Sequence, residues 1–166
     1  MSDVSGPRTR VLVCGERMRG DDAAALVAVE MLPEDARALA EVVEVGQLSV
    51  EALLDVPDGM AVIVADAAVG LAAGVVVTLP LERMAARGGV GASGGAAPAS
   101  SHSLPPDQVL ALAAELRGSM PRGVFVGIGG AEFSFGEELS AAVVAGLATF
   151  AAALADEIRR LSADEP

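Results

Sequence analysis

Five short apolar runs along the chain have the length and composition of β-strands. They are Arg10–Cys14, Glu41–Val45, Ala61–Ala65, Gly74–Leu79 and Gly123–Ile128. The run Glu41–Val45 alternates polar and apolar residues, which is typical of a half-exposed edge strand. The runs Ala61–Ala65 and Gly74–Leu79 are almost wholly apolar, so we predict that both are central strands covered on both faces.

Segments with helical character lie between these runs. Asp22–Met31 follows the first strand, Ser49–Leu54 begins with a residue suited to an N-cap, and Pro106–Leu116 has proline in its first turn. The last helix is predicted to follow an N-cap at Ser140. Its apolar residues recur at three- and four-residue steps, which indicates one buried stripe: Val143, Leu147, Phe150, Leu154, Ile158 and Leu161.

This alternation of strands and helices predicts the fold class: an α/β three-layer sandwich, with a five-stranded, mostly parallel sheet between helices. Only the third and fourth strands follow each other directly, so that pair is the candidate for an antiparallel connection. Residues 1–166 are predicted to form a single domain. Residues 87–101 are rich in Gly, Ala and Ser and are predicted to be a flexible loop. Residues 1–8 and 162–166 are predicted to be loose tails.

Charge and cysteine content narrow the choice of partners. The net charge is −12 and the basic residues are scattered, which argues against binding to a phosphate backbone.

The apolar stretch 60–81 is long enough to cross a bilayer. It contains Asp66, Gly70, Gly74 and Pro80, however, and two strands explain it better than a membrane span. One cysteine and no recognisable signal peptide predict a cytoplasmic protein, while the oligomeric state stays open.

Polar residues that follow the predicted strands suggest where chemistry could occur. In open α/β sheets, ligands bind beyond the carboxyl ends of the strands. Asp22 follows the first strand, Asp66 follows the third, and His102 precedes the helix that leads to the fifth. Two carboxylates and one imidazole suit a divalent metal with an open position for water or substrate. Asp21 or Glu132 is then a candidate supporting residue or proton acceptor.

Structural explanations compete with this metal site. Adjacent acidic residues at a helix start, such as Asp21 and Asp22, are ordinary capping and helix-dipole residues. Asp66 could form a turn, His102 could be a solvated loop residue, and Glu132 could be a surface or capping residue. The residues alone leave these alternatives open.

Four segments, taken in order, resemble the hydrogenase maturation protease family. These enzymes trim the C-terminus of the nickel-containing hydrogenase large subunit. The family pattern has an apolar strand leading to paired acidic residues, a second strand ending in Asp, a Ser-rich approach to a histidine, and a last strand before the C-terminal helix. The matching segments are Val11–Asp22 (VLVCGERMRGDD), Val62–Ala67 (VIVADA), Ser100–Leu104 (SSHSL) and Val126–Phe133 (VGIGGAEF), the last followed by Gly136 and Leu139–Ser140.

The resemblance implies a fold, an activity and a ligand set. The fold would be a twisted five-stranded, phosphorylase/hydrolase-like sheet between helices. The activity would be endoproteolytic removal of the C-terminal extension of a hydrogenase large-subunit precursor. Asp22, Asp66 and His102 would be both the catalytic and the metal-contacting residues. The metal would be Ni2+, which the substrate could itself supply and another divalent ion could replace.

The sequence also departs from the family pattern. Glu16 stands where the family usually has Asn, and Ala23–Ala25 replace a usual Gly-Xaa-Gly. The insertion before His102 is long. Two alternatives therefore stay open: a non-catalytic nickel-binding assembly factor on the same scaffold, and a metallohydrolase that acts on a small molecule.

Overall fold

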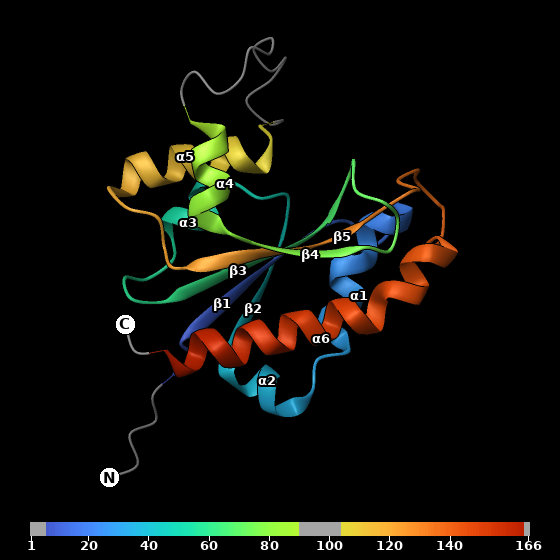
Figure 1. Ribbon diagram of the computed structural model, residues 1–166, viewed down its shortest axis with the longest axis horizontal. Coiled ribbons are helices and arrows are strands. Elements are labelled where there is room, and N and C mark those ends of the chain that lie inside the picture. The colour runs from blue at the N-terminus through green and yellow to red at the C-terminus, as the bar shows by residue number, and fades with distance from the viewer. Residues whose placement is uncertain (1–5, 90–103, 165–166) are drawn as a thin grey trace.

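The computed structural model describes residues 6–89 and 104–164. They form a five-stranded sheet with helices on both faces (Figure 1). The strands are β1 (Thr9–Cys14), β2 (Ala40–Gly46), β3 (Ala61–Ala68), β4 (Val76–Pro80) and β5 (Gly123–Gly129). The helices are the 3-10 helix η1 (Gly20–Ala23), α1 (Ala24–Glu30), α2 (Glu34–Leu39), α3 (Val50–Leu54), α4 (Leu81–Gly88), α5 (Pro106–Arg117) and α6 (Ala141–Ala163).

The strand order is β2-β1-β3-β5-β4. The first three adjacent pairs are parallel, and only β4 runs antiparallel, against β5. The predicted mostly parallel α/β sandwich is therefore confirmed. The position of β2 at one edge explains its alternation of half-buried and exposed residues.

The prediction for the apolar run Gly74–Leu79 was wrong in one respect. This run contains β4, which lies at the opposite edge of the sheet and has two exposed residues among its five. It does run antiparallel, but its partner is β5 and not β3. This edge strand carries apolar residues on both faces because each face is partly covered. Val76 packs on one core cluster and Val77 on the other.

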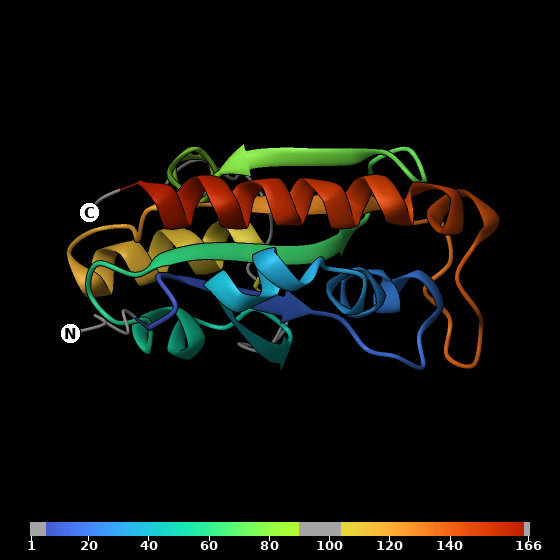
Figure 2. The same cartoon turned by 90° about the horizontal axis from the view of Figure 1, so that it is seen from below.

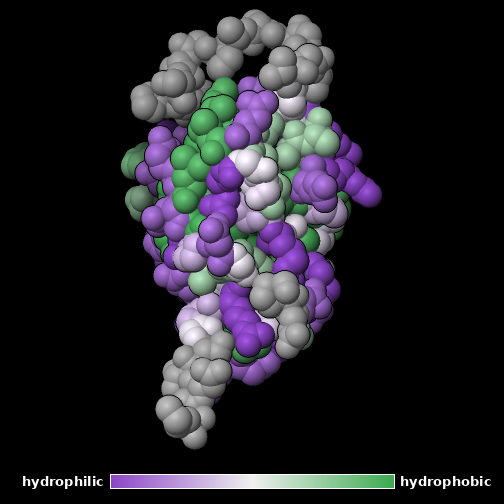
Figure 3. Space-filling model, turned by 90° about the vertical axis from the view of Figure 1, so that its left-hand side faces the viewer, coloured by the Kyte–Doolittle hydropathy of each residue, from purple (hydrophilic) through white to green (hydrophobic). Residues whose placement is uncertain are grey.

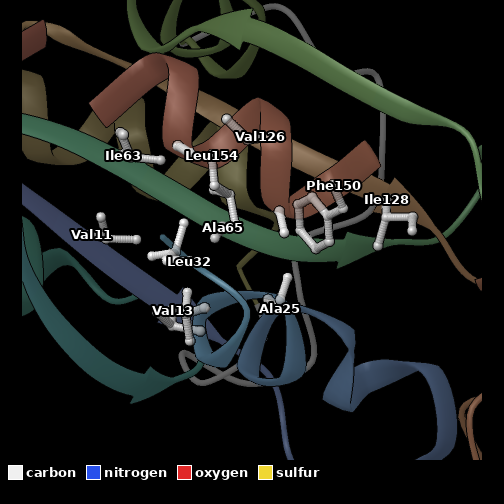
Figure 4. Close-up of a cluster of buried hydrophobic side chains, with 14 of the residues drawn as sticks. Val11, Val13, Ala25, Leu32, Ile63, Ala65, Val126, Ile128, Phe150 and Leu154 are labelled. Atoms are coloured by element: carbon white, nitrogen blue, oxygen red, sulfur yellow. The ribbon is translucent and has the colours of Figure 1, made fainter. Parts of the chain in front are cut away.

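Two apolar cores separate the three layers. One lies between the sheet and the layer of α1, α2 and α6; Figure 4 shows part of it, with Phe150 and Leu154 of α6 facing Ile63, Ala65 and Ile128 of the sheet. The other lies under α3, α4 and α5. Residues of β3 alternate between the two, as the two-residue period of a strand requires: Ile63, Ala65 and Ala67 face the first core, Val62 and Val64 the second.

The predicted caps are confirmed. The hydroxyl of Ser49 accepts a hydrogen bond from Ala52 N–H at 3.2 Å, and that of Ser140 accepts one from Val143 N–H at 3.4 Å. In the described part of the chain, α6 is the one helix long and apolar enough to cross a membrane. Its apolar face is buried against the sheet, as in the core helix of a globular domain.

The helices also differ from the prediction at several points. Helices α2 and α4 were not predicted; both are short and follow a proline, Pro33 and Pro80. Helix α4 continues through Arg87 and Gly88, so the first two residues of the segment predicted to be flexible are helical; residues 90–101 lie outside the described part. Helix α6 likewise extends to Ala163, and Ser162 in the predicted tail pairs with buried Thr9 at 2.9 Å.

Candidate active site

A pocket of about 440 Å³ lies at the carboxyl ends of β1, β2 and β3. Asp22 and Asp66 both line it, as the sequence predicted. The other lining residues come from the end of β2 and from the loops that follow β1 and β2: Gly15, Glu16, Arg19, Gly46 and Gln47. Figure 2 shows the loop after β1 at the same end of the molecule as the loop between β5 and α6.

Glycine is required where β1 ends. Gly15 has a φ of 121°, and its N–H donates to the carbonyl of Gly46 at 2.6 Å, which ties the ends of β1 and β2 together. A Cβ at this position would lie 1.9 Å from the carbonyl oxygen of Asp22. Gly15 therefore lets the backbone of Asp22 pack directly against the strand end and so positions its carboxylate.

Asp66 lies inside β3, opposite Gly127 of β5, and not at the strand end. By alternation its side chain points to the same face of the sheet as Val64, which is the side covered by α3 and α5. That core ends beside the pocket, so the carboxylate is half-buried at the border between apolar core and open solvent.

Burial raises the pKa of both carboxyl groups, and the charge of Asp22 adds to this effect at Asp66. Burial first, and then the nearby charge of Asp22, raise the pKa of Asp66 to about 7, against a backbone hydrogen bond from Ala67. Burial also raises the pKa of Asp22, although a backbone hydrogen bond from Glu16 and the positive charge of Arg19 oppose this. Two carboxyl groups that disfavour each other's ionisation suit a bound cation, which would relieve the repulsion.

The described residues supply two oxygen ligands to such a cation. Among them no group of three or more His, Cys, Asp and Glu residues is placed to hold a metal. His102, the predicted third ligand, lies outside the described residues. Asp22 and Asp66 alone fit a divalent ion that completes its coordination with other donors.

Cys14 lies at the end of β1, close to both carboxylates. Its side chain is buried, and burial, with the charges of Asp66 and Asp22, raises the pKa of its thiol far above its usual range. The thiol therefore stays protonated. A thiol in this state is a poor nucleophile and a poor metal ligand, so Cys14 serves as a core residue.

Asp21, the neighbour of Asp22, lies in a different environment. It is completely buried and faces away from the pocket, toward the loop between β5 and α6. Its carboxylate accepts hydrogen bonds from Ala131 N–H at 2.7 Å, Glu132 N–H at 2.9 Å, and the N–H and hydroxyl of Ser140 at 2.7 and 2.9 Å. Burial raises the pKa of Asp21, but these hydrogen bonds outweigh it and hold the pKa below its ordinary value.

Asp21 and Glu132, the candidate supporting residues, direct their carboxylates to backbone donors of the segment after β5. Neither residue lines the pocket. The carboxylate of Glu132 accepts a hydrogen bond from Ser134 N–H at 2.9 Å, as a turn-capping residue does. Asp21 instead fastens the loop after β1 to the start of α6, with three backbone hydrogen bonds alongside it: Gly20 N–H to Glu137, Asp21 N–H to Glu132 and Gly136 N–H to Met18.

Two of the three departures from the family pattern lie in the described part of the chain, and the insertion before His102 lies largely outside it. Glu16 is exposed and pairs with Arg19 at 3.5 Å, so its charge is partly balanced at the mouth of the pocket. Ala23, Ala24 and Ala25 are buried where the 3-10 helix continues into α1. Ala24 and Ala25 pack in the core under α1, α2 and α6.

Comparison with known proteins finds solved structures with a similar fold. No protein-family model matches the sequence, and neither does any curated protein. Solved structures do match. A NiFe hydrogenase maturation protease HybD from Thermococcus kodakarensis is 25% identical with a TM-score of 0.63, over 88% of this chain and 95% of that chain. The hydrogenase maturating endopeptidase HybD from E. coli is 22% identical with a TM-score of 0.68, over 92% and 93% of the two chains. The Hydrogenase 3 maturation protease has a TM-score of 0.64 at 18% identity.

Proposed function

We propose that this chain, a member of the hydrogenase maturation protease family, removes the C-terminal extension of a nickel-containing hydrogenase large-subunit precursor. The observation that carries the proposal is the pairing of Asp22 and Asp66 in one open pocket at the carboxyl edge of a sheet with this family's fold. In this proposal Asp22, Asp66 and His102 contact a divalent ion, Ni2+ by preference, which the protein binds or the precursor carries in.

The chemistry divides between the ion and the protein. When bound, a divalent ion supplies Lewis acidity toward a peptide carbonyl and toward water. Asp22 and Asp66 would give it oxygen ligands from two different elements, the 3-10 helix η1 and strand β3. Without metal the pKa of Asp66 is about 7, so this carboxyl group is partly protonated at neutral pH and would have to release its proton to bind the ion.

The pocket also explains how a peptide could reach the carboxylates. Gly15 and Gly46 line it and carry no side chains, so an extended substrate backbone can approach closely. Gln47 and Arg19 are exposed at its border and offer hydrogen-bond donors to peptide carbonyls.

The direct test is processing of the purified large-subunit precursor, followed by intact mass. Asp22→Asn, Asp66→Asn and His102→Ala should each abolish cleavage while circular dichroism and thermal unfolding stay those of a folded protein. Asp58→Asn, at a fully exposed position, is the matched control and should cleave normally. Unchanged cleavage by all three site variants would sink the proposal.

A non-catalytic nickel-binding assembly factor is the second candidate. Glu16 at the mouth of the pocket and the buried Ala23–Ala25 favour it, since both differ from the usual family pattern. This alternative predicts that the protein binds nickel or the precursor without changing the mass of the precursor. Calorimetric nickel titration of the wild type and of His102→Ala, run beside the processing assay, separates the two functions.

A further inference from the structure

A second hollow of about 460 Å³ lies directly beside the carboxylate pocket, and Gln47 lines both. This hollow, which we call the α5 groove, has six apolar side chains in its lining. It is bounded by the segment after β2 and by α5: Gln47, Leu48, Ser49, Val50, Glu51, Leu104, Val109, Leu112 and Leu116.

The α5 groove exposes apolar surface that the fold does not need. Leu112 is 39% and Leu116 is 62% exposed, and with Val109 they form one row along α5 at three- and four-residue spacing. Figure 3 shows hydrophobic side chains gathered in the upper part of the face that it presents, over the layer of α3, α4 and α5. Val109 is buried, so Leu112 and Leu116 supply the exposed apolar surface of the groove, and apolar surface gathered beside a candidate active site suits a binding surface.

The length and direction of the groove suit an extended peptide. It meets the carboxylate pocket at Gln47 and is lined along α5 by Val109, Leu112 and Leu116. A helix of 12 residues is about 18 Å long, which is the length of about five residues of extended chain. A peptide bond held at Asp22 and Asp66 would therefore place a neighbouring segment of its own chain in the groove.

The charge of the groove defines the occupant further. Glu51 is its only charged lining residue, is exposed, and forms no ion pair within residues 6–89 and 104–164. The guanidinium of Arg117, next to Leu116, is held elsewhere, by the carbonyls of Leu53 and Val56 at 2.9 and 2.8 Å. The whole chain carries a net charge of −12. The groove therefore attracts an apolar segment that bears a basic side chain and repels an acidic one.

We propose that the α5 groove binds an apolar segment with a Lys or Arg residue, adjacent in the substrate to the bond that is cleaved. This inference rests on the proposed function and assigns substrate recognition to Leu112, Leu116 and Glu51. These residues bind the substrate at a distance from the reacting atoms, so their loss weakens substrate binding and leaves the chemical step intact.

The test compares Leu112→Glu and Leu116→Glu with Val144→Glu, a matched control at a 55% exposed position of α6 on the other side of the sheet. With the purified precursor, both groove variants should raise KM at least tenfold and change kcat less than twofold, whereas the control should change neither. Glu51→Lys should also raise KM. Replacing the basic residue of the precursor segment by Glu should bring the KM of the Glu51→Lys variant back toward the wild-type value.

Two readouts separate failure of the groove from failure of the proposed function. Binding of the precursor to the Asp66→Asn variant, measured by biolayer interferometry, should weaken when Leu116→Glu is added, whether or not the wild type cleaves. A photo-crosslinking residue at position 112 should capture the C-terminal part of the precursor, and one at position 144 should not. Normal KM and normal binding in both groove variants would overturn the inference. A wild-type dimer that dissociates in Leu116→Glu would also overturn it, because a second copy would then occupy the groove.

Discussion

The carboxylate of Asp21 holds both the backbone N–H and the hydroxyl of Ser140, at 2.7 and 2.9 Å, across a separation of 119 residues. The same Ser140 hydroxyl caps α6 by accepting from Val143 N–H. One buried charge therefore joins the loop that carries Asp22 to the start of the longest helix. Since Asp22 is the next residue, this connection fixes the backbone from which the site carboxylate projects.

Replacing Asp21 by Asn should destabilise the protein. The amide keeps only one acceptor oxygen and would turn its NH2 group toward backbone donors in a fully buried place. Loss of charged hydrogen bonds of this kind costs about 2–4 kcal/mol in the free energy of unfolding. Urea denaturation measures the change. Asp58→Asn, at a fully exposed position, should leave the midpoint almost unchanged, and an equal midpoint for Asp21→Asn would show that the network carries no stability.

The metal-free protein should lose stability as the pH rises toward neutrality. The pKa of Asp66 is raised from its ordinary value to about 7, so the folded state binds a proton more tightly than the unfolded state does. The stabilisation is complete below about pH 4 and is lost as the pH rises through 7. The contribution is at most about 4 kcal/mol, since each pKa unit corresponds to 1.36 kcal/mol.

Asp66→Asn should remove that pH dependence. Without metal, the variant should be more stable than the wild type above pH 7, because it never places a second negative charge beside Asp22. Thermal unfolding between pH 4 and 8, in the presence of a chelator, measures both curves. Parallel curves for the two proteins would contradict the assignment of the raised pKa to Asp66.

A bound divalent metal should restore the stability that the protein loses when Asp66 ionises beside Asp22. Binding requires both carboxylates to be deprotonated, so it should release protons near neutral pH and weaken as the pH falls below 7. A ligand at one hundred times its Kd adds about 2.7 kcal/mol to the free energy of unfolding. Calorimetry in two buffers of different ionisation enthalpy counts the protons released. Asp22→Asn should abolish the binding, and a full metal-induced stabilisation of that variant would place the ion elsewhere.

Gly15→Ala should destabilise the protein more than a glycine substitution whose only effect is backbone strain. Gly15 and Gly59 both have a positive φ, 121° and 82°, but only at Gly15 would the added Cβ meet another atom, the carbonyl oxygen of Asp22 at 1.9 Å. Gly59→Ala should cost about 1 kcal/mol, and Gly15→Ala clearly more, with loss of metal binding. Equal unfolding free energies for the two variants would show that the loop relaxes freely around Gly15.

Much of the framework follows from the sequence by itself. Runs of four or five apolar residues, the Ser49 and Ser140 caps and the period of α6 are local signals, and local sterics and hydrogen bonding fix them. They predict five strands, mostly parallel, between helices. The position of Asp22 and Asp66 at one edge also follows, because parallel strands end on the same side of a sheet.

Tertiary structure alone decided the rest. An apolar run such as Val76–Leu79 does not reveal whether it lies at the centre or the edge of a sheet, because helices can cover an edge strand on both faces. Asp21 and Asp22 are the same residue type and adjacent in sequence. Asp21 is nevertheless buried and accepts hydrogen bonds from backbone N–H groups, whereas Asp22 lines the pocket. That difference depends on the β5–α6 loop more than 100 residues away, and such long-range packing leaves no trace in the local pattern of polar and apolar residues.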